Sequence, residues 1–262
     1  MKVNGKWRSL GWRHPLWDYV RFYSVFRGKK RDEWIGKLRE GRFEVEPGKF
    51  LVVADGHIEL FLNYLDNRDG DLATANSLLR TKDEALAFCE KLKVVVGMTA
   101  TQLPGWTDTP QALVAGVTGV AKLVCDQKSV AFVSKPDRRC LWLLDHHLHV
   151  TARNLDGAVP SLANPTIVWE IKEYWGEKSG GSKMSDAVYE CNLVGRELRE
   201  FEDRTEHRHV THVVFVDGKQ QWASRQSDVR RMIDLFHQGL IDHLFFGKEV
   251  ESDWQALLMS ML

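Results

Sequence analysis

From about residue 111 onward, the sequence alternates between short apolar runs of strand type and longer segments with helical periodicity. This alternation restricts the fold strongly, because strands interleaved with helices form a sheet that helices cover. The expected helices are 111–125, 182–203 and 227–239, and the expected strands are 130–133, 140–144, 147–155, 166–174, 211–216 and 244–246. We therefore expect an α/β fold in which a mixed central sheet is flanked by helices.

The first hundred residues follow a different, mainly helical pattern, with one expected strand at 50–54. A helix over 82–92 is expected to begin after Thr81, because Thr81 and Glu84 have the spacing of a capping box. The loop-like residues 105–110 mark the expected seam. The predicted domains are a basic and aromatic N-terminal region at 1–104 and a core domain at 105–262.

The charge of the chain is balanced overall but not locally. Thirty-six basic and thirty-six acidic residues cancel, so the net charge indicates neither a nucleic-acid partner nor a membrane. Residues 1–42, however, contain twelve basic and only four acidic side chains. The aromatic residues interleaved with them are Trp7, Trp12, Trp17, Tyr19, Phe22, Tyr23, Phe26 and Trp34. Two interpretations stay open: these rings stack on nucleic-acid bases, or they pack on the protein body while Arg and Lys stay solvated.

The expected location of the protein is the cytoplasm. No stretch approaches the roughly twenty apolar residues of a membrane helix, and the first residues lack the apolar core of a secretory signal. The four cysteines are far apart and form no CxxC pair, so we expect free thiols in a reducing compartment. We expect no membrane partner.

The expected strand at 166–174 carries two charged side chains on one face. Because side chains alternate along a strand, Glu170 and Lys172 lie on the same face, whereas Ile167, Trp169 and Ile171 lie on the other. One interpretation is a solvated Glu/Lys pair on an open sheet face. The other is a functional site, because charges are uncommon in a strand with so many β-branched and aromatic residues.

A second acidic residue is placed near Glu170 if the chain forms a hairpin. Pro160 and Pro165 bracket a turn centred on position 163, and an antiparallel pairing about that centre puts Asp156 opposite Glu170. Facing side chains in such a pair are about 5 Å apart at Cβ. Two carboxylates at this separation repel each other unless a cation such as Mg²⁺ binds between them. With Lys172 on the same face, these groups form a site suited to phosphodiester hydrolysis.

Asp156-Gly157 and Glu170-Ile171-Lys172, with thirteen residues between Asp156 and Glu170, together resemble the motif of the PD-(D/E)XK nucleases, the restriction-endonuclease-like superfamily. The resemblance covers roughly residues 110–217, and its core order of helix, three strands, helix and strand agrees with the expected elements. It implies that Asp156 and Glu170 bind the catalytic Mg²⁺ and that the backbone carbonyl of Ile171 is a further ligand. It also implies that Lys172 positions or deprotonates the attacking water, and that cleavage leaves a 5′-phosphate and a 3′-hydroxyl.

Two features depart from the pattern of this superfamily. Leu155, rather than a proline, precedes Asp156. The expected helix at 111–125 carries no acidic residue of the kind that supplies an additional metal ligand in some members. The number of metal ions, one or two, therefore stays open.

The resemblance and the size of the chain favour a Mg²⁺-dependent endonuclease that cuts double-stranded DNA at specific sequences, as type II restriction enzymes do. Such enzymes are usually homodimers, because cutting both strands of a palindrome needs two sites related by a two-fold axis. One alternative is a phage-defence nuclease of the same fold that a partner or ligand activates and that cuts without sequence preference. Another is a non-catalytic DNA-binding module.

Residues outside the motif are weaker candidates. Ser182 and Lys183 lie at the end of a glycine-rich stretch that enters a helix, and they are expected to hold a DNA phosphate. The alternative for these two residues is an ordinary surface loop. Arg225 is expected to contact DNA. Glu190 is expected to point back toward the site.

The rival metal site is the cluster at 145–149, but zinc needs about four ligands and no further pair is visible. His146, His147 and Asn154 give that segment a superficial similarity to the His-Asn-His nucleases.

Overall fold

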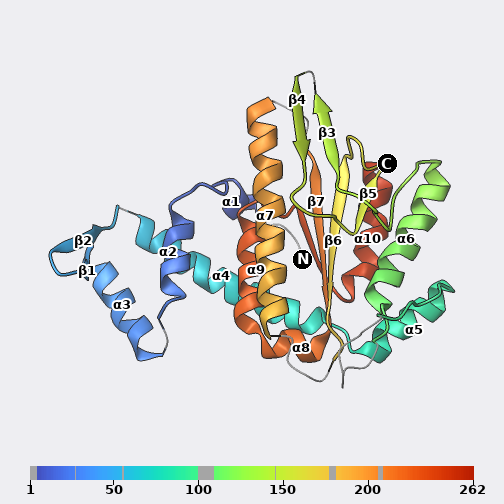
Figure 1. Cartoon of the computed structure of the whole chain (residues 1–262). Helices are drawn as coiled ribbons and strands as arrows, with labels where there is room; N and C mark the ends of the chain where they lie inside the picture. Colours follow the sequence, from blue (N-terminus) through green and yellow to red (C-terminus); the bar gives the residue numbers. More distant parts are fainter. Residues whose placement is uncertain are drawn as a thin grey trace.

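The computed structural model describes residues 5–26, 28–54, 56–99, 109–144, 146–176, 181–205 and 209–262. The protein has a mixed α/β fold built around a four-stranded sheet in the order β5-β6-β7-β8 (Figure 1). Its strands are β5 (Gly157–Val159), β6 (Ile167–Glu173), β7 (Thr211–Asp217) and β8 (His243–Phe246). β5 is antiparallel to β6, whereas β6, β7 and β8 are parallel. The expected mixed sheet flanked by helices is therefore confirmed.

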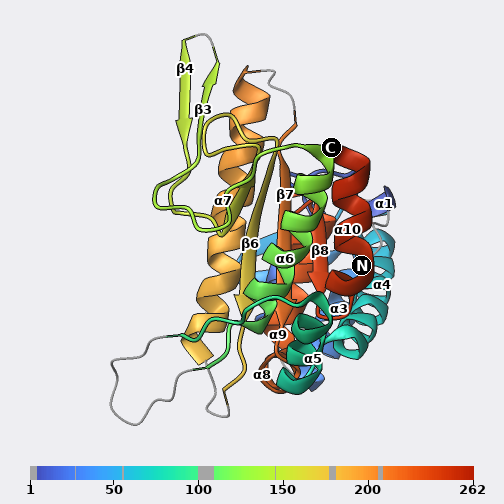
Figure 2. The same cartoon turned by 90° about the vertical axis from the view of Figure 1, so that its right-hand side faces the viewer.

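Helices cover both faces of this sheet (Figure 2). On one face lie α6 (Ala112–Lys128) and α10 (Glu249–Met261); on the other lie α7 (Gly181–Thr205) and α9 (Gln226–His237), which follows the short α8 (Lys219–Ser224). Every residue of β7 is buried. Val213 and Phe215 belong to the core under α6 and α10, and Val214 and Val216 to the core under α7 and α9. The continuous apolar run of β7 is thus explained by burial on both faces.

β5 and β6 form the predicted hairpin about residues 160–166. Gly157 pairs with Trp169 and Val159 pairs with Ile167, which is the register expected from a turn centred on position 163. β3 (Leu141–Leu144) and β4 (His147–Val150) form a separate antiparallel hairpin that projects past the end of the sheet (Figures 1 and 2).

Two expected strands differ from the structure. The strand expected at 147–155 ends at Val150. Thr151 still donates its backbone N–H to the carbonyl of Cys140, but the chain then bends at 152–153, where the Thr151 hydroxyl donates to the carbonyl of Arg153. The run at 130–133 is not a regular strand: only Val133 pairs with the sheet, through an isolated bridge to Ala158.

The N-terminal region is mainly helical, as expected, and it contains one small hairpin. Its elements are α1 (Gly5–Arg8), α2 (Leu16–Tyr23), α3 (Lys29–Arg39), β1 (Arg42–Glu46), β2 (Lys49–Val52), α4 (His57–Leu78) and α5 (Lys82–Leu92). The strand expected at 50–54 is β2, and its partner β1 was not expected. The predicted capping box at the start of α5 is present, with Thr81 and Glu84 bonding each other's backbone.

Aromatic side chains of the N-terminal region build a core of their own. Trp7, Trp17 and Trp34 are each no more than 2% exposed and cluster with Phe61 and Tyr64 of α4. Because these three indoles are buried, they cannot stack on nucleic-acid bases, and for them the packing interpretation is correct. The same region also packs on the rest of the protein, since Leu72 and Ala75 of α4 join the core formed by α7 and α9. The predicted boundary between 104 and 105 falls outside the described residues.

The helices among the described residues include none that is long and apolar enough to cross a membrane.

Candidate active site

The central pair of the candidate site comes from β6. Val168, two residues before Glu170, packs in the cluster that contains Val194 and Leu198 of α7, whereas Trp169 packs on the opposite face of the sheet. By alternation, Glu170 and Lys172 project toward α7. Both are nearly inaccessible to solvent, with exposures of 1% and 5%. The interpretation of Glu170 and Lys172 as a solvated surface pair is therefore wrong.

Asp156 contacts β6 on both sides of Glu170. Its backbone N–H donates to the carbonyl of Trp169 at 3.0 Å, and its Oδ2 accepts a hydrogen bond from the backbone N–H of Ile171 at 2.7 Å. The β5–β6 register, continued by one residue beyond Gly157, brings Asp156 to Glu170. The structure thus brings together the four residues of the predicted motif, although Asp156, unlike Glu170, keeps surface in contact with solvent. Desolvation by the surrounding protein raises the pKa of Asp156, and the hydrogen bond from Ile171 opposes that rise.

Three cationic or potentially cationic groups surround the carboxylate of Glu170. Lys172 Nζ lies 2.8 Å and an Arg153 guanidinium nitrogen 3.3 Å from Oε2, and His212 Nε2 lies 3.3 Å from Oε1. Burial alone would raise the pKa of Glu170, but the charge of Lys172 and the hydrogen bond and charge of His212 lower it to about 2. Glu170 is therefore a fixed negative charge inside the protein.

Lys172 lies between two carboxylates. Its Nζ donates to Glu170 and also to Glu190 Oε2 of α7, at 2.7 Å, so Glu190 points back to the site as predicted. Burial would lower the pKa of Lys172, but Glu170 outweighs it and the pKa is raised. Lys172 is thus a stable ammonium group in this arrangement. It is suited to position a water molecule or hold a phosphate oxygen, and it is not suited to remove a proton from water.

Sequence reasoning missed two residues of this site, Arg153 and His212. His212 is the register partner of Val168 on the neighbouring strand β7. Its Nδ1 lies 2.9 Å from the carbonyl of Leu240, which only accepts, so Nδ1 carries a proton. The signal for His212 was a histidine within the otherwise apolar run of β7. Arg153 lies in the loop before β5, where no sequence pattern marks it.

A pocket of about 480 Å³ opens beside Asp156. It lies between the start of α6, the loop at 134–136 and the loop that carries Arg153 and Asp156. Its lining residues are Gln111, Val114, Ser134, Lys135, Pro136, Arg153, Asn154, Leu155 and Asp156. The walls thus offer two cations and several neutral hydrogen-bonding groups next to a carboxylate, which suits a polar, negatively charged ligand.

The donor atoms of the site suit a hard cation. Asp156, Glu170 and the Ile171 carbonyl supply only oxygen, which Mg²⁺ prefers over nitrogen or sulfur ligands. Within the described part of the chain, no group of three or more His, Cys, Asp and Glu side chains is arranged to hold a metal. An ion at this site would therefore have two side-chain ligands and would displace part of the cation shell around Glu170.

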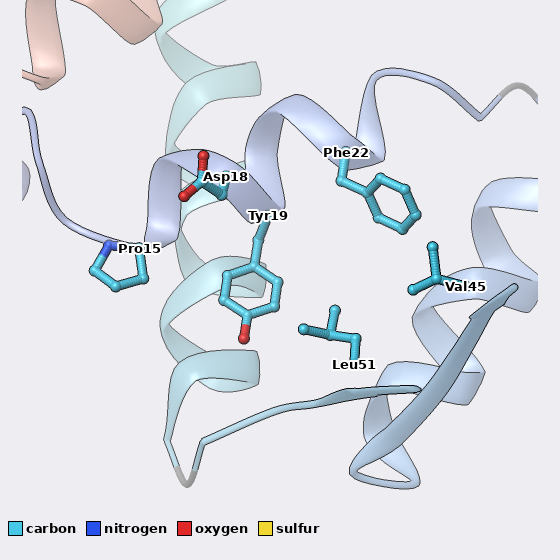
Figure 3. A pocket seen from close by; sticks show the side chains of 6 residues that line it. All are labelled: Pro15, Asp18, Tyr19, Phe22, Val45 and Leu51. Carbon is cyan, nitrogen blue, oxygen red and sulfur yellow. The ribbon is translucent and has the colours of Figure 1, made fainter. Parts of the chain in front are cut away.

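A second pocket, of about 460 Å³, lies in the N-terminal region and has a different character. Tyr19 and Phe22 of α2 face Val45 and Leu51 of the β1–β2 hairpin across it (Figure 3). Its walls are mainly apolar, and its one acid, Asp18, is paired with Arg21. This pocket has none of the charged groups that a phosphate ligand needs.

Residues 80–261 match a protein family described as a domain of unknown function, DUF7687. The chain belongs to this family. Comparison with curated proteins and with solved structures found no match. The DUF7687 segment begins at Arg80, so it includes α5, the four-stranded sheet and every residue of the candidate active site.

The predicted DNA contacts lie together at one end of α7 within the DUF7687 segment. Ser182 and Lys183 are exposed in its first turn. Arg225 is close to the same turns, because its guanidinium donates to Ser185 at 2.9 Å as well as pairing with Asp228 at 2.7 Å. Seven residues of helix, about 10 Å, separate Lys183 from Glu190. Residues 177–180 of the glycine-rich stretch lie outside the described residues, and the DNA-binding role of these side chains stays a prediction.

The rival cluster at 145–149 lies on the projecting β3–β4 hairpin, away from Glu170. Asp145 is outside the described residues, and His147 is exposed. The ring of His149 stacks on Phe201 of α7 at a centroid distance of 5.0 Å, and burial lowers its pKa. His149 therefore packs as an aromatic ring against the helix.

Proposed function

We propose that this protein is a Mg²⁺-dependent endonuclease of the PD-(D/E)XK superfamily that hydrolyses phosphodiester bonds of double-stranded DNA. The observation that carries the proposal is the placement of Asp156 against β6 on both sides of Glu170, with the ammonium group of Lys172 bonded to Glu170. Two carboxylates and a lysine in this arrangement are the groups that the superfamily motif requires.

The order of the elements supports the proposal. α6 precedes the sheet, β5 and β6 form an antiparallel pair, and α7 crosses to β7, which is parallel to β6. The resemblance implies a core of helix, three strands, helix and strand. Two of the three strands, β5 and β6, lie in the four-stranded sheet, and an isolated bridge from Val133 to Ala158 extends it on the side of β5. We propose that residues 105–262 form this restriction-endonuclease-like core.

In the proposed reaction, Asp156, Glu170 and the carbonyl oxygen of Ile171 would hold Mg²⁺. When bound, the ion would polarise the phosphate as a Lewis acid and lower the pKa of a water molecule. Lys172 holds that water or a non-bridging phosphate oxygen. Attack of water on phosphorus forms the new P–O bond and breaks the bond to the 3′ oxygen. The attacking water loses a proton to solvent and the 3′ oxygen takes one up from solvent, so the products carry a 5′-phosphate and a 3′-hydroxyl.

The proposed partners are double-stranded DNA and a second copy of the chain. Ser182, Lys183 and Arg225 are the proposed DNA contacts at the start of α7. A homodimer would bring two sites to a palindromic sequence, as a type II restriction endonuclease needs. A nuclease of the same fold that acts without sequence preference, after activation by a partner or ligand, would use the same catalytic residues.

One observation favours a second candidate function, a DNA-binding module without catalysis. Each carboxylate oxygen of Glu170 already has a cationic or potentially cationic partner, and buried ion clusters can be purely structural. In this candidate, Glu170 and Lys172 stabilise the sheet, and the pocket beside Asp156 binds a phosphate without cleaving it.

The experiment that tests the proposal is incubation of the purified protein with phage genomic DNA in Mg²⁺ and, separately, in EDTA. Asp156→Ala serves as the variant, because this side chain reaches solvent, and Asp126→Ala removes an exposed acid elsewhere as its control. Discrete Mg²⁺-dependent fragments that Asp156→Ala abolishes are expected from a sequence-specific enzyme, and a smear is expected from a non-specific one. DNA that is bound but left intact by the wild type would contradict a nuclease and favour the second candidate.

A further inference from the structure

Arg153 bridges two carboxylates of the candidate site. Its guanidinium pairs with Glu190 and lies 3.3 Å from Glu170 Oε2, while Asp156 is three residues further along the same loop. A guanidinium group in this place supplies to Glu170 the positive charge that the proposed metal ion would supply to it.

Two cations of the cluster already pair with two carboxylates in the absence of a metal ion. Lys172 and Arg153 each form ion pairs with both Glu170 and Glu190. A divalent ion added to this set would be repelled by the cations already present. One cation has to move away before a metal binds with full strength.

Arg153 is the most exposed of the three groups around Glu170, so its side chain can move most easily. The side chain of Lys172 is 5% exposed and that of His212 is wholly buried, whereas the side chain of Arg153 is 32% exposed and belongs to a loop. Arg153 also lines the pocket beside Asp156, in which Lys135 lies as well. The long side chain of Arg153 can therefore turn from the carboxylates into the pocket without unfolding the sheet.

We propose that Arg153 is an exchangeable cation: it neutralises Glu170 and Glu190 until a divalent metal binds, and then turns into the adjacent pocket to bind a phosphate of the nucleic acid beside Lys135. This inference rests on the proposed metal-dependent nuclease. It assigns the pocket between α6 and the 153–156 loop to a phosphate of the substrate, and it makes metal and nucleic acid bind cooperatively.

Removal of the Arg153 side chain should change the affinities for Mn²⁺ and for DNA in opposite directions. In Arg153→Ala, a competitor for the carboxylates is lost, so Mn²⁺ affinity rises by about tenfold. The same variant lacks a phosphate contact, so its affinity for a short DNA duplex in Ca²⁺ falls by about tenfold. If Arg153 only supported the fold, its removal would lower the affinity for both Mn²⁺ and DNA.

Mn²⁺ binding is measured by electron paramagnetic resonance and DNA binding by fluorescence anisotropy, on the full chain. Arg153→Gln is the second variant, since it keeps a hydrogen-bonding side chain, and Arg138→Ala removes an exposed arginine from the loop before β3 as a control for net charge. Tighter Mn²⁺ binding together with weaker DNA binding in both Arg153 variants, but not in Arg138→Ala, is the expected result.

Two results would overturn the inference, and they are distinguishable. If Glu170→Gln lowers Mn²⁺ affinity but the Arg153 variants bind Mn²⁺ no more tightly than the wild type, Arg153 does not compete with the metal and the exchange is refuted. If the wild type binds no Mn²⁺ that depends on Glu170, the proposed metal site fails, and the exchange fails with it.

Discussion

Lys172 donates a hydrogen bond of 2.8 Å to Glu170, two residues earlier on the same strand, and both side chains are buried. A Glu/Lys pair on one face of a strand is ordinary when that face is in water. Beneath α7, however, neither charge is stable alone, because each loses its hydration and depends on the other. The cluster of Lys172, Glu170, Glu190, Arg153 and His212 is therefore expected to affect stability as well as any chemistry.

Replacing Lys172 by methionine is expected to destabilise the fold. The substitution keeps most of the side-chain volume but leaves Glu170 with fewer cationic partners, so the free energy of unfolding should fall by about 3 kcal/mol. Urea denaturation followed by circular dichroism measures this change. Lys122→Met is the matched control, because Lys122 forms an exposed pair with Asp126 and should cost less than about 1 kcal/mol. Equal effects of the two substitutions would contradict the account of the buried pair.

Gly157 is expected to tolerate no side chain. A Cβ at this position would lie 1.9 Å from Cζ2 of Trp169, whose indole packs against the backbone of its register partner. Gly157→Ala should therefore displace the indole and destabilise the fold by about 2–3 kcal/mol, and it should also disturb the adjacent Asp156. Thermal denaturation detects the loss.

The control for Gly157→Ala is Gly70→Ala in the middle of α4, where an added Cβ meets no atom within 4 Å. This change should stabilise the protein by up to about 1 kcal/mol, since alanine favours a helix more than glycine does. A Gly157→Ala variant as stable as the wild type would show that Trp169 moves without cost.

Glu173 is expected to make stability depend on pH. Burial raises its pKa from 4.5 to about 7, although it accepts hydrogen bonds from the Trp175 indole and the backbone N–H of Leu113. Because the folded state holds the proton more tightly than the unfolded state, the contribution of Glu173 is greatest at low pH. It is lost as the pH rises from about 4.5 to about 7.

Glu173→Gln replaces the titrating carboxyl with a neutral amide. It should therefore make the free energy of unfolding less dependent on pH between about pH 4.5 and about pH 7. Urea midpoints of the wild type and the variant at about pH 5 and about pH 8 measure the effect. The variant should gain about 1–2 kcal/mol relative to the wild type at the higher pH, a value reduced for the partial exposure of Glu173. A difference between the two proteins that is the same at both pH values would contradict the raised pKa of Glu173.

The parts of the fold that depend on local sequence could be predicted. The capping box of Thr81 and Glu84 fixes where α5 begins, and Pro160 and Pro165 bracket a turn whose centre sets the register of β5 and β6. From that register the proximity of Asp156 and Glu170 followed, because residue positions in a hairpin are related by a simple symmetry about the turn.

The contacts made by distant segments could not be predicted. His212 reaches Glu170 only because β7 pairs in parallel with β6 after the crossover through α7, and sequence spacing does not give the register of such a pair. The position of Arg153 depends on the end of β4 at Val150, whereas the sequence predicted a strand that continues to Leu155. The burial of Trp7, Trp17 and Trp34 likewise depends on α4, which supplies Phe61 and Tyr64 from a distance in sequence.

If Asp156 and Glu170 form a metal-dependent hydrolytic site, the rate at which the protein nicks a supercoiled plasmid in Mg²⁺ should depend on the charge of Asp156. This rate is measured for the wild type and for Asp156→Asn. Asparagine keeps an oxygen for the N–H of Ile171 but loses the charge, and the position reaches solvent, so the urea midpoint should stay unchanged. Cleavage by the wild type should stop in EDTA, and Asp156→Asn should be slower by at least about a hundredfold. A folded Asp156→Asn that nicks the plasmid as fast as the wild type, or a wild type that does not nick DNA in Mg²⁺, would refute a hydrolytic metal site at Asp156 and Glu170.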